Sequence, residues 1–570
     1  MAAKRTSPRR RKTIASEYNL LVRKIPMRDG VRLHTRIYLP RETGRHNVIL
    51  QRTPYDKDSV LKAPEESYFR ADAVFIHQSC RGTGMSDGVF YPWQNEADDT
   101  EDTIRWIAGQ KWFSGRLTLD GASYGGWLQW GAAARAPEAL VGFTPAFAPA
   151  DLYADVYPGG ALLLHLYSGW GMSMHCAANL SNEHIPNWER LRLAENLPLK
   201  DIDLAATGEA VPFWRDWIEN PRRNAYWAQF DVDWTRIAAP AYIVGGWFDH
   251  YCNAALENFT AMRERAGDPQ ARAFTRCLIG PWTHTGLANP ELFGKETTPE
   301  AVAADRALRF KEGLMENPAV DPLPDEAPVT YYMLGAKKWH TAQTWPPENS
   351  AEEKYYLHSS GCANSVLGNG DLNLAPPADE QFDTCIYNPF QPVPTTGGGF
   401  LGGGKNGCLD QSELEKRLDI LVFTSAPLDK DLEIAGRVRV VLWASSSAPD
   451  TDFCAKLVDV APDGTALNLC DGIIRARFRN SDKVEELLEG GEICRYLIDC
   501  RHTANCFRAG HRLRLELSHS NFPRFDRNPN TGAKFGDNAL MNLAKQVVYH
   551  DAARPSHLIL PVLRQSLATL

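Results

Sequence analysis

Short apolar runs alternate with helical patterns through the first third of this chain. The runs at residues 47–51, 73–77 and 117–119 are too short for helices and are typical of strands that are buried on both faces. Between them, residues 98–108 place isoleucines at helical spacing, with acidic side chains in the first turn. Strands that alternate with helices favour parallel pairing, so this pattern predicts an α/β fold built on a parallel sheet.

The pattern changes twice further along the chain. Residues 146–235 are rich in Tyr, Trp, Leu and Ala and read as helical, and the α/β pattern then resumes at 241–244 and 276–279. From about residue 350, short strands follow one another almost without helices, which is typical of a β-sandwich or jelly roll. The predicted divisions are a disordered basic tail at 1–16, an α/β catalytic unit at 17–145 and 236–345, a helical cap at 146–235 and a jelly-roll domain at 346–570.

Charge and hydropathy exclude several classes of partner. The chain carries 62 Lys and Arg against 70 Asp and Glu, a net charge of −8, which offers no electrostatic footprint for nucleic acid. The most apolar stretch, 158–172, is interrupted by Gly, His and Ser and is too short to cross a membrane. The basic N-terminal residues precede no apolar region of a secretory signal, so we expect a cytoplasmic protein.

The twelve cysteines predict neither a disulfide scaffold nor a metal site. They are spread along the chain without any Cys-x-x-Cys pair, and we expect reduced thiols that pack as small apolar side chains. The densest group is Cys494, Cys500, His502 and Cys506, but its alternating pattern predicts one strand with Cys494 and Cys500 on the same face. We expect no metal and no cofactor.

A nucleophile motif stands in the α/β part of the chain. Gly121-Ala122-Ser123-Tyr124-Gly125 fits Gly-x-Ser-x-Gly, follows the strand at 117–119 and precedes a helical run at 127–135. This is the strand–turn–helix setting of a nucleophile elbow, in which small neighbours allow a strained turn. Ser123 would then stand at a helix N-terminus, where free N–H groups favour developing negative charge.

An acid and a base follow later strands in the order that this motif requires. The strand at 241–244 leads into the segment 245–249, which ends in Asp249, and the strand at 276–279 leads into the segment 280–284, which ends in His284. Both are expected at the same sheet edge as Ser123, because the carboxyl ends of parallel strands lie together. The adjacent His250 is the other candidate base, and we expect its side chain to point elsewhere.

The oxyanion of an acyl-transfer reaction needs two hydrogen-bond donors. One is expected from the backbone N–H of Tyr124, the residue after the nucleophile. The other is expected from the loop at 53–57, where the residues alone leave a backbone amide and the Tyr55 hydroxyl as alternatives.

Several segments together resemble one family of serine hydrolases, the cocaine-esterase and X-prolyl dipeptidyl-peptidase group (CocE/NonD-like). The segments are RTPYDK (52–57), RGTGMSDG (81–88), GQKWFSGRLTLDGASYGG (109–126), GGWFD (245–249), GPWTH (280–284) and LVFTSAPLDKDLEIAG (421–436). The resemblance covers residues 20–560 and implies an α/β-hydrolase core with an inserted helical cap and a C-terminal β-sandwich (jelly roll) packed beside the active site. It also implies the triad Ser123, Asp249 and His284, and it assigns the second oxyanion donor to the Tyr55 hydroxyl.

We therefore expect hydrolysis of a small-molecule carboxylic ester through an acyl-serine intermediate. The aromatic residues favour a bulky, mainly apolar acyl or alcohol part. The predicted pocket residues are Trp247, Phe248, Trp282, Tyr153 and Trp170. Amino-ester hydrolases of the group carry acidic residues just after the triad acid, whereas residues 250–252 here are His, Tyr and Cys.

Three other functions stay open from the sequence. An acyltransferase, or an X-Pro dipeptidyl-peptidase or amidase, would use the same triad with another acceptor or substrate. A non-catalytic carbohydrate-binding protein would use the jelly roll alone. A homodimer or a larger homo-oligomer is equally open.

Overall fold

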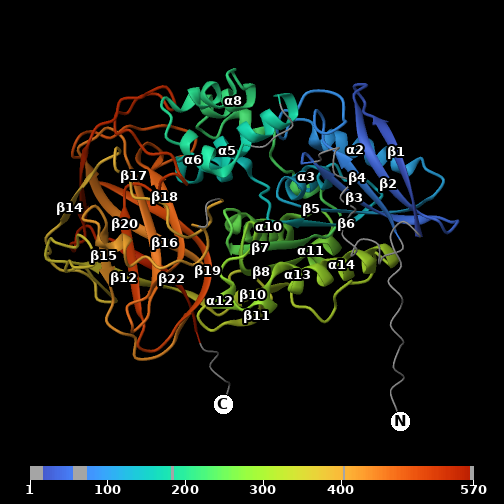
Figure 1. Cartoon of the computed structure of the whole chain (residues 1–570). Coiled ribbons are helices and arrows are strands. Elements are labelled where there is room, and N and C mark those ends of the chain that lie inside the picture. The colour runs from blue at the N-terminus through green and yellow to red at the C-terminus, as the bar shows by residue number, and fades with distance from the viewer. Residues whose placement is uncertain (1–16, 56–72, 181–184, 402–404, 565–570) are drawn as a thin grey trace, which may run out of the picture.

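The computed structural model describes residues 17–55, 73–180, 185–401 and 405–564 of the chain. The predicted basic tail at 1–16 lies outside the described residues. Figure 1 shows an α/β part with a long sheet, a cluster of helices above it, and a β-rich part beside both. None of the described helices is both long enough and apolar enough to span a membrane.

The first sheet has parallel strands in its centre and antiparallel strands at its edges. In sheet order its main strands are β1 (Tyr18–Pro26), β2 (Arg32–Pro40), β4 (Val74–Ser79), β3 (His46–Thr53), β5 (Phe113–Ala122), β6 (Leu140–Ala146), β7 (Tyr242–Phe248), β8 (Arg276–Thr283), β10 (Val329–Met333) and β11 (Lys338–Ala342), and β9 (Gly286–Leu287) pairs with β8. All neighbouring pairs from β4 to β10 are parallel. The parallel sheet that the alternating pattern predicted is therefore present.

Helices cover both faces of this sheet. The helices of this part are α2 (Glu96–Ala108), α3 (Tyr124–Ala133), α10 (Cys252–Arg265), α11 (Pro269–Phe274), α12 (Pro290–Phe293), η6 (Lys295–Thr297), α13 (Pro299–Val302) and α14 (Ala304–Glu316). Ile243 packs in one apolar cluster with Leu256 of α10, whereas the next residue, Val244, packs in another with Phe310 of α14. Because successive strand residues point to opposite faces, the sheet is buried on both sides. This explains why its strands read as uninterrupted apolar runs.

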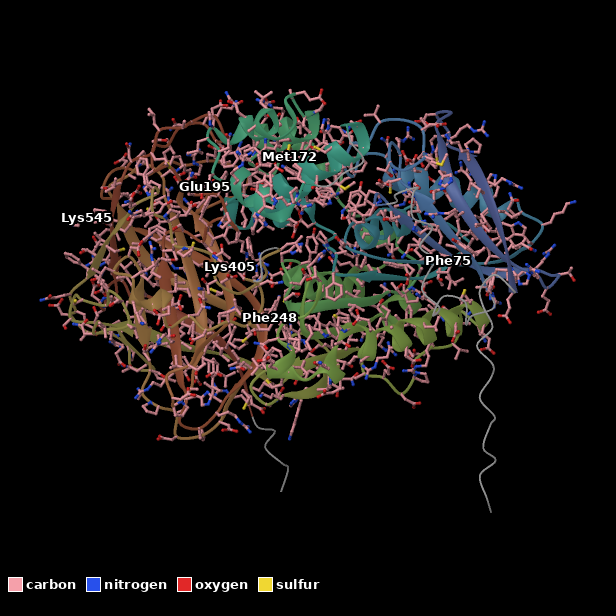
Figure 2. All side chains as sticks on the ribbon, in the orientation of Figure 1. Phe75, Met172, Glu195, Phe248, Lys405 and Lys545 are labelled. Carbon is pink, nitrogen blue, oxygen red and sulfur yellow. The ribbon has the colours of Figure 1, made fainter. Side chains whose placement is uncertain are left out.

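The elements that the structure describes between β6 and β7 are all helical. They are α4 (Leu152–Val156), η2 (Pro158–Gly160), α5 (Leu164–His175), η3 (Cys176–Leu180), α6 (Asn187–Leu193), η4 (Leu199–Asp201), α7 (Ile202–Thr207), α8 (Pro212–Glu219), α9 (Ala225–Ala228) and η5 (Trp234–Arg236). Trp214, Trp217 and Trp227 are almost completely buried here, as is Met172 of α5, which Figure 2 labels among the helices. Their cluster also includes Ile473 of the β-rich part. Most of the aromatic bulk in this segment therefore builds a core that joins the parts of the molecule.

The β-rich part begins after β11. Its elements are β12 (Ser350–His358), β13 (Asp371–Asn373), β14 (Asp383–Tyr387), η7 (Leu414–Lys416), β15 (Leu421–Thr424), β16 (Leu432–Ser446), β17 (Asp452–Val460), β18 (Ala466–Arg475), η8 (Ala476–Phe478), β19 (Cys494–Phe507), β20 (Arg512–Ser518), β21 (Ala544–Tyr549) and β22 (His557–Leu563). Among the described residues every pair except β13–β15 is antiparallel. Cys494 and Cys500 lie buried on the single strand β19, as the alternation predicted. The assignment of this part as a jelly roll stays a prediction.

Backbone N–H groups that follow the first sheet bond directly to β19 of the second sheet. Leu334, just after β10, donates its N–H to the carbonyl of Ala504 in β19 at 3.0 Å, and the N–H of Gly335 donates to the side chain of Asn505 at 2.8 Å. At Gly335 a Cβ atom would lie 2.0 Å from the carbonyl oxygen of Cys506, so only glycine permits this approach. The β-rich part is thus fixed close to the strand ends of the first sheet, where the candidate site lies.

Candidate active site

Ser123 occupies a strained turn between β5 and α3. Its φ of 57° and ψ of −126° are rare for a residue with a Cβ atom, and such strain persists only where the surroundings enforce it. The Ser123 N–H donates to the carbonyl of Ala146 in β6 at 2.9 Å, and the Ser123 carbonyl accepts from Gly126 and Trp127 at 2.9 Å. A Cβ atom at Gly121 would lie 2.9 Å from the Gly125 carbonyl oxygen. These contacts hold the serine at the tip of the turn.

Two neighbouring parallel strands bring an acid and a base to this turn. Asp249 follows the last residue of β7, and His284 follows the last residue of β8. His284 Nε2 lies 2.9 Å from Ser123 Oγ, and His284 Nδ1 lies 3.0 Å from Asp249 Oδ1. The three side chains that the sequence selected are therefore joined in one hydrogen-bonded chain.

The electrostatics of this chain suit proton transfer. Asp249 is 1% exposed, and although burial raises its pKa, the adjacent His284 and His250 outweigh that effect and hold the pKa below its usual value. Asp249 is therefore a carboxylate at neutral pH and accepts from His284 Nδ1–H. The other ring nitrogen, Nε2, is then free to accept the hydroxyl proton of Ser123, as a general base must.

Both expected oxyanion donors stand beside Ser123. Tyr124 is the first residue of α3, so its N–H has no partner within the helix. The Tyr55 hydroxyl is in hydrogen-bonding contact with Ser123, and it accepts a bond of 3.2 Å from Trp170 Nε1. Because Trp170 donates to the phenol oxygen, the phenol proton stays available for another acceptor. The neighbouring Asp56 and Lys57 of the predicted loop lie outside the described residues.

A cavity of about 290 Å³ opens above Ser123. Its described lining is mostly aromatic and apolar: Tyr55, Trp93, Ser123, Tyr124, Trp127, Pro149, Leu152, Leu166, Tyr167, Trp170, His250, Tyr251, His284, Thr285 and Leu401. No Asp, Glu, Lys or Arg side chain is among these described lining residues. The cavity is therefore suited to a neutral, bulky group.

Four of the five predicted pocket residues do not line this cavity. Trp170 does, but Trp247, Phe248 and Trp282 are core residues that are at most 4% exposed (Figure 2 labels Phe248). Trp247 and Trp282 bond backbone carbonyls within the α/β part, at Tyr332 and Thr297. These residues lie inside the strands β7 and β8, both of whose faces are covered, whereas only the residues past the strand ends reach the cavity.

The prediction that Tyr153 lines the pocket is wrong for a different reason. It lines a separate cavity of about 320 Å³ between the helices and the β-rich part, and its hydroxyl donates to the Pro221 carbonyl at 3.2 Å. The residues that sequence reasoning missed include Trp93, Trp127 and Tyr251. They come from separate elements with no common spacing, so no periodic signal singled them out.

His250 was also placed wrongly. Its ring does not point away from the acid, because His250 Nδ1 lies 3.2 Å from Asp249 Oδ1 and its ring centroid lies 4.4 Å from that of His284. Asp249, His250 and His284 are the ligand-type side chains that come within 4.8 Å of one another among the described residues. Their shortest contact is the hydrogen bond of the triad itself, so we assign them to acid–base chemistry.

Comparison with known proteins places this geometry in context. The sequence matches the X-Pro dipeptidyl-peptidase (S15 family) over residues 29–286, and the X-Pro dipeptidyl-peptidase C-terminal non-catalytic domain over residues 323–559. It is 34% identical over 574 aligned residues to the cocaine esterase of Rhodococcus sp. (strain MB1 Bresler), covering 95% of this chain and 98% of that protein.

Two solved structures share the whole fold. The crystal structure of an aminopeptidase from a marine sediment Thaumarchaeota archaeon superposes with a TM-score of 0.84 at 23% identity, covering 99% of both chains. An α-amino acid ester hydrolase superposes with a TM-score of 0.80 at 24% identity, covering 98% of this chain and 100% of that one. The α/β core, the helical segment and the β-rich part thus form one known arrangement.

Proposed function

This chain belongs to the cocaine-esterase and X-Pro dipeptidyl-peptidase (S15) family of serine hydrolases, and on that premise we propose that it hydrolyses carboxylic esters of small molecules through an acyl-serine intermediate. The observation that carries the proposal is the chain of two hydrogen bonds, 2.9 Å and 3.0 Å long, that joins Ser123, His284 and Asp249 at the floor of an aromatic cavity.

The three side chains divide the reaction between them. His284 Nε2 takes the proton of Ser123 as the oxygen attacks the ester carbonyl, and it returns a proton to the departing alkoxide. Asp249 fixes the orientation of the imidazole and stabilises the imidazolium that forms in between. Water then attacks the acyl-serine by the same sequence of proton transfers, and the acid product leaves.

The oxyanion is proposed to lie between Tyr55 and Tyr124. Desolvation raises the pKa of Tyr55, so the phenol keeps its proton at neutral pH and donates a hydrogen bond to the negative oxygen. The Tyr124 N–H, at the start of α3, supplies the second donor together with the favourable end of the helix dipole.

The lining of the cavity indicates the class of substrate. Indole and phenol rings from Trp93, Trp127, Trp170 and Tyr124 surround the space beside Ser123. A bulky, uncharged acyl or alcohol part fits such a cavity well, because the burial of apolar surface is then the main source of the substrate's affinity. A substrate with a free amino group next to the scissile bond would find no carboxylate among the described lining residues, which disfavours peptidase and amino-ester activity.

A panel of substrates tests this function. We expect p-nitrophenyl butyrate and benzoate to be hydrolysed with a higher kcat/KM than the acetate, and an Ala-Pro p-nitroanilide to be hydrolysed far more slowly. A reversed order, with the anilide preferred, would establish a peptidase. Assays with added alcohols or amines separate hydrolysis from acyl transfer through the products formed.

Ser123→Ala tests the nucleophile. We expect it to lower kcat by about 10⁴-fold or more and to abolish labelling by a fluorophosphonate. Ser114→Ala is the matched control, since Ser114 lies on the same strand but its hydroxyl donates to the Asn47 side chain at 2.6 Å, away from the triad. Activity of Ser123→Ala equal to that of the wild type would contradict the mechanism.

A further inference from the structure

The triad carboxylate faces two imidazole rings. Asp249 Oδ1 lies 3.0 Å from His284 Nδ1 and 3.2 Å from His250 Nδ1, so one oxygen serves both rings. A ring nitrogen this close to a carboxylate carries its proton, because a bare lone pair would be repelled by the negative oxygen. The proton of neutral His250 therefore lies on Nδ1. The partial positive charge of this N–H acts on the same Asp249 oxygen that stabilises His284.

His250 itself stays uncharged. Burial lowers the pKa of His250 well below its usual value. The charge of Asp249 opposes that effect, and Arg501 and Arg524 add to it. The residue is 4% exposed, and its other nitrogen, Nε2, has no hydrogen-bond partner among the described residues. A polar ring buried at such a cost requires a compensating contact, and the contact that it makes is with the triad acid.

The β-rich part fixes His250 in this position. Arg501 of β19 donates from Nη1 to the His250 carbonyl at 2.6 Å, and it does so from a strained backbone with φ of 73°. The backbone of Gly399 lies so close that a Cβ atom there would be 2.7 Å from the His250 N. On the other side, the ring of Tyr251 lies 3.9 Å from that of His250, centroid to centroid. These contacts therefore hold the His250 backbone in the position from which its ring meets Asp249.

Charged and titratable groups from several elements surround His250. Those that act on it or touch it are Asp249 and Tyr251 of its own turn, His284 after β8, Arg501 of β19 and Arg524 after β20, and Asp155 of α4 and His165 of α5 line cavities that His250 also lines. Asp249 is the member of this set that His250 touches through Nδ1, and through it His250 reaches His284.

We propose that His250 is a positioning residue of the triad, which contacts the same oxygen of the Asp249 carboxylate as His284 does and weakens its pull on the His284 proton. The proposal rests on the function proposed above and adds a second histidine to its acid. Because a hydrogen donor beside a carboxylate spreads its negative charge, Asp249 stabilises the His284 imidazolium less than an unshared carboxylate would. Removal of the donor should therefore make the His284 imidazolium easier to form.

Two substitutions separate this role from packing. His250→Leu keeps about the same volume without a donor, and we expect the acid limb of the kcat/KM profile to move up by about 0.5 to 1 pH unit. His250→Asn places an amide N–H where Nδ1 stands, and we expect the profile to return close to that of the wild type. Denaturation midpoints of both variants establish that they fold.

The experiments distinguish a failure of the role proposed for His250 from a failure of the proposed esterase function. An unshifted acid limb in a folded His250→Leu variant, or an equal shift in His250→Asn, would overturn the role of His250. NMR titration of histidine-labelled protein reports the pKa of His284 without substrate, so the same comparison can be made even if no ester is turned over. Absence of turnover with the predicted shift present would refute the esterase function alone.

Discussion

Tyr55 is a single side chain on which much of the proposed catalysis depends. Its hydroxyl contacts Ser123 and accepts from Trp170 at 3.2 Å. We expect Tyr55→Phe to lower kcat by about 10²- to 10³-fold with little change in KM, because the bond to the oxyanion forms only in the transition state. Steady-state kinetics on a p-nitrophenyl ester measure this.

Tyr153→Phe is the control for that substitution. It removes an equivalent hydroxyl from the separate cavity, where Tyr153 bonds the Pro221 carbonyl, and kcat should stay within a factor of two or so of the wild-type value. Equal losses of activity in both variants would show that the effect of Tyr55→Phe comes from stability and not from the oxyanion.

Asp155 is a second residue with a measurable signature. Burial, partly offset by a hydrogen bond donated by Tyr167, raises the pKa of Asp155 to about 8. Between the ordinary value near 3.8 and this one, the folded protein holds a proton that the unfolded chain has lost. The contribution of Asp155 to stability is therefore full at low pH and is lost as the pH rises toward 8.

Asp155→Asn removes this pH dependence and keeps an oxygen that can accept from Tyr167. We expect its stability relative to the wild type to improve as the pH rises from 5 to 7, by up to about 1.4 kcal/mol per pH unit. Urea unfolding of both proteins at pH 5, 6 and 7 gives the difference directly. A difference that stays constant across this range would show that Asp155 is already ionised in the folded state.

At the scale of elements, the fit of α3 against β6 sets the position of the nucleophile. A Cβ atom at Gly126 would lie 2.7 Å from Ala148 Cβ and 2.8 Å from the Ala146 carbonyl oxygen. We expect Gly126→Ala to push α3 away from β6, to lower kcat/KM by about 10- to 100-fold and to cost about 1–3 kcal/mol of stability. Kinetics and denaturation midpoints test both effects.

Gly109→Ala is the matched substitution at the end of α2. A Cβ atom there meets only the Trp106 carbonyl oxygen, at an ordinary 3.5 Å, so both activity and stability should be retained. If Gly126→Ala were as active as Gly109→Ala, the placement of Ser123 would not depend on this helix–strand contact.

At the scale of the whole molecule, the β-rich part supports the acid of the triad. Gly399 packs on the turn after β7, where a Cβ atom would lie 2.9 Å from the Asp249 carbonyl oxygen. We expect Gly399→Ala to displace Asp249 and to lower kcat by tenfold or more, since an imidazole without its oriented acid is a poor base.

Gly490→Ala provides the comparison within the same part of the chain. Its nearest neighbour would be the Ser447 carbonyl oxygen at 4.0 Å, and we expect wild-type kcat. Fluorophosphonate labelling of Ser123 should slow in Gly399→Ala and stay unchanged in Gly490→Ala. Unchanged labelling in both would show that the β-rich part does not act on the triad.

Much of the arrangement around Ser123 was accessible from the sequence, because it follows from local rules. Strand runs, the Gly-x-Ser-x-Gly turn and the chain order of Asp249 and His284 are read from neighbouring residues, and parallel strands bring their carboxyl ends together. The resemblance to a family supplied the choice of Tyr55. The catalytic roles of these side chains are proposals for the experiments above.

The walls of the cavity and the surroundings of Asp249 were decided only by the tertiary structure. Trp247, Phe248 and Trp282 are as aromatic as Trp93 and Trp127, yet the former three are buried in the core and the latter two face the cavity. Which ring reaches a cavity depends on how helices and strands that are far apart in the sequence pack against one another. The spacing of residues along the sequence does not determine that packing. The position of His250 beside Asp249 also depends on tertiary contacts, because Arg501 and Gly399, which contact the His250 backbone, are far from it in the sequence.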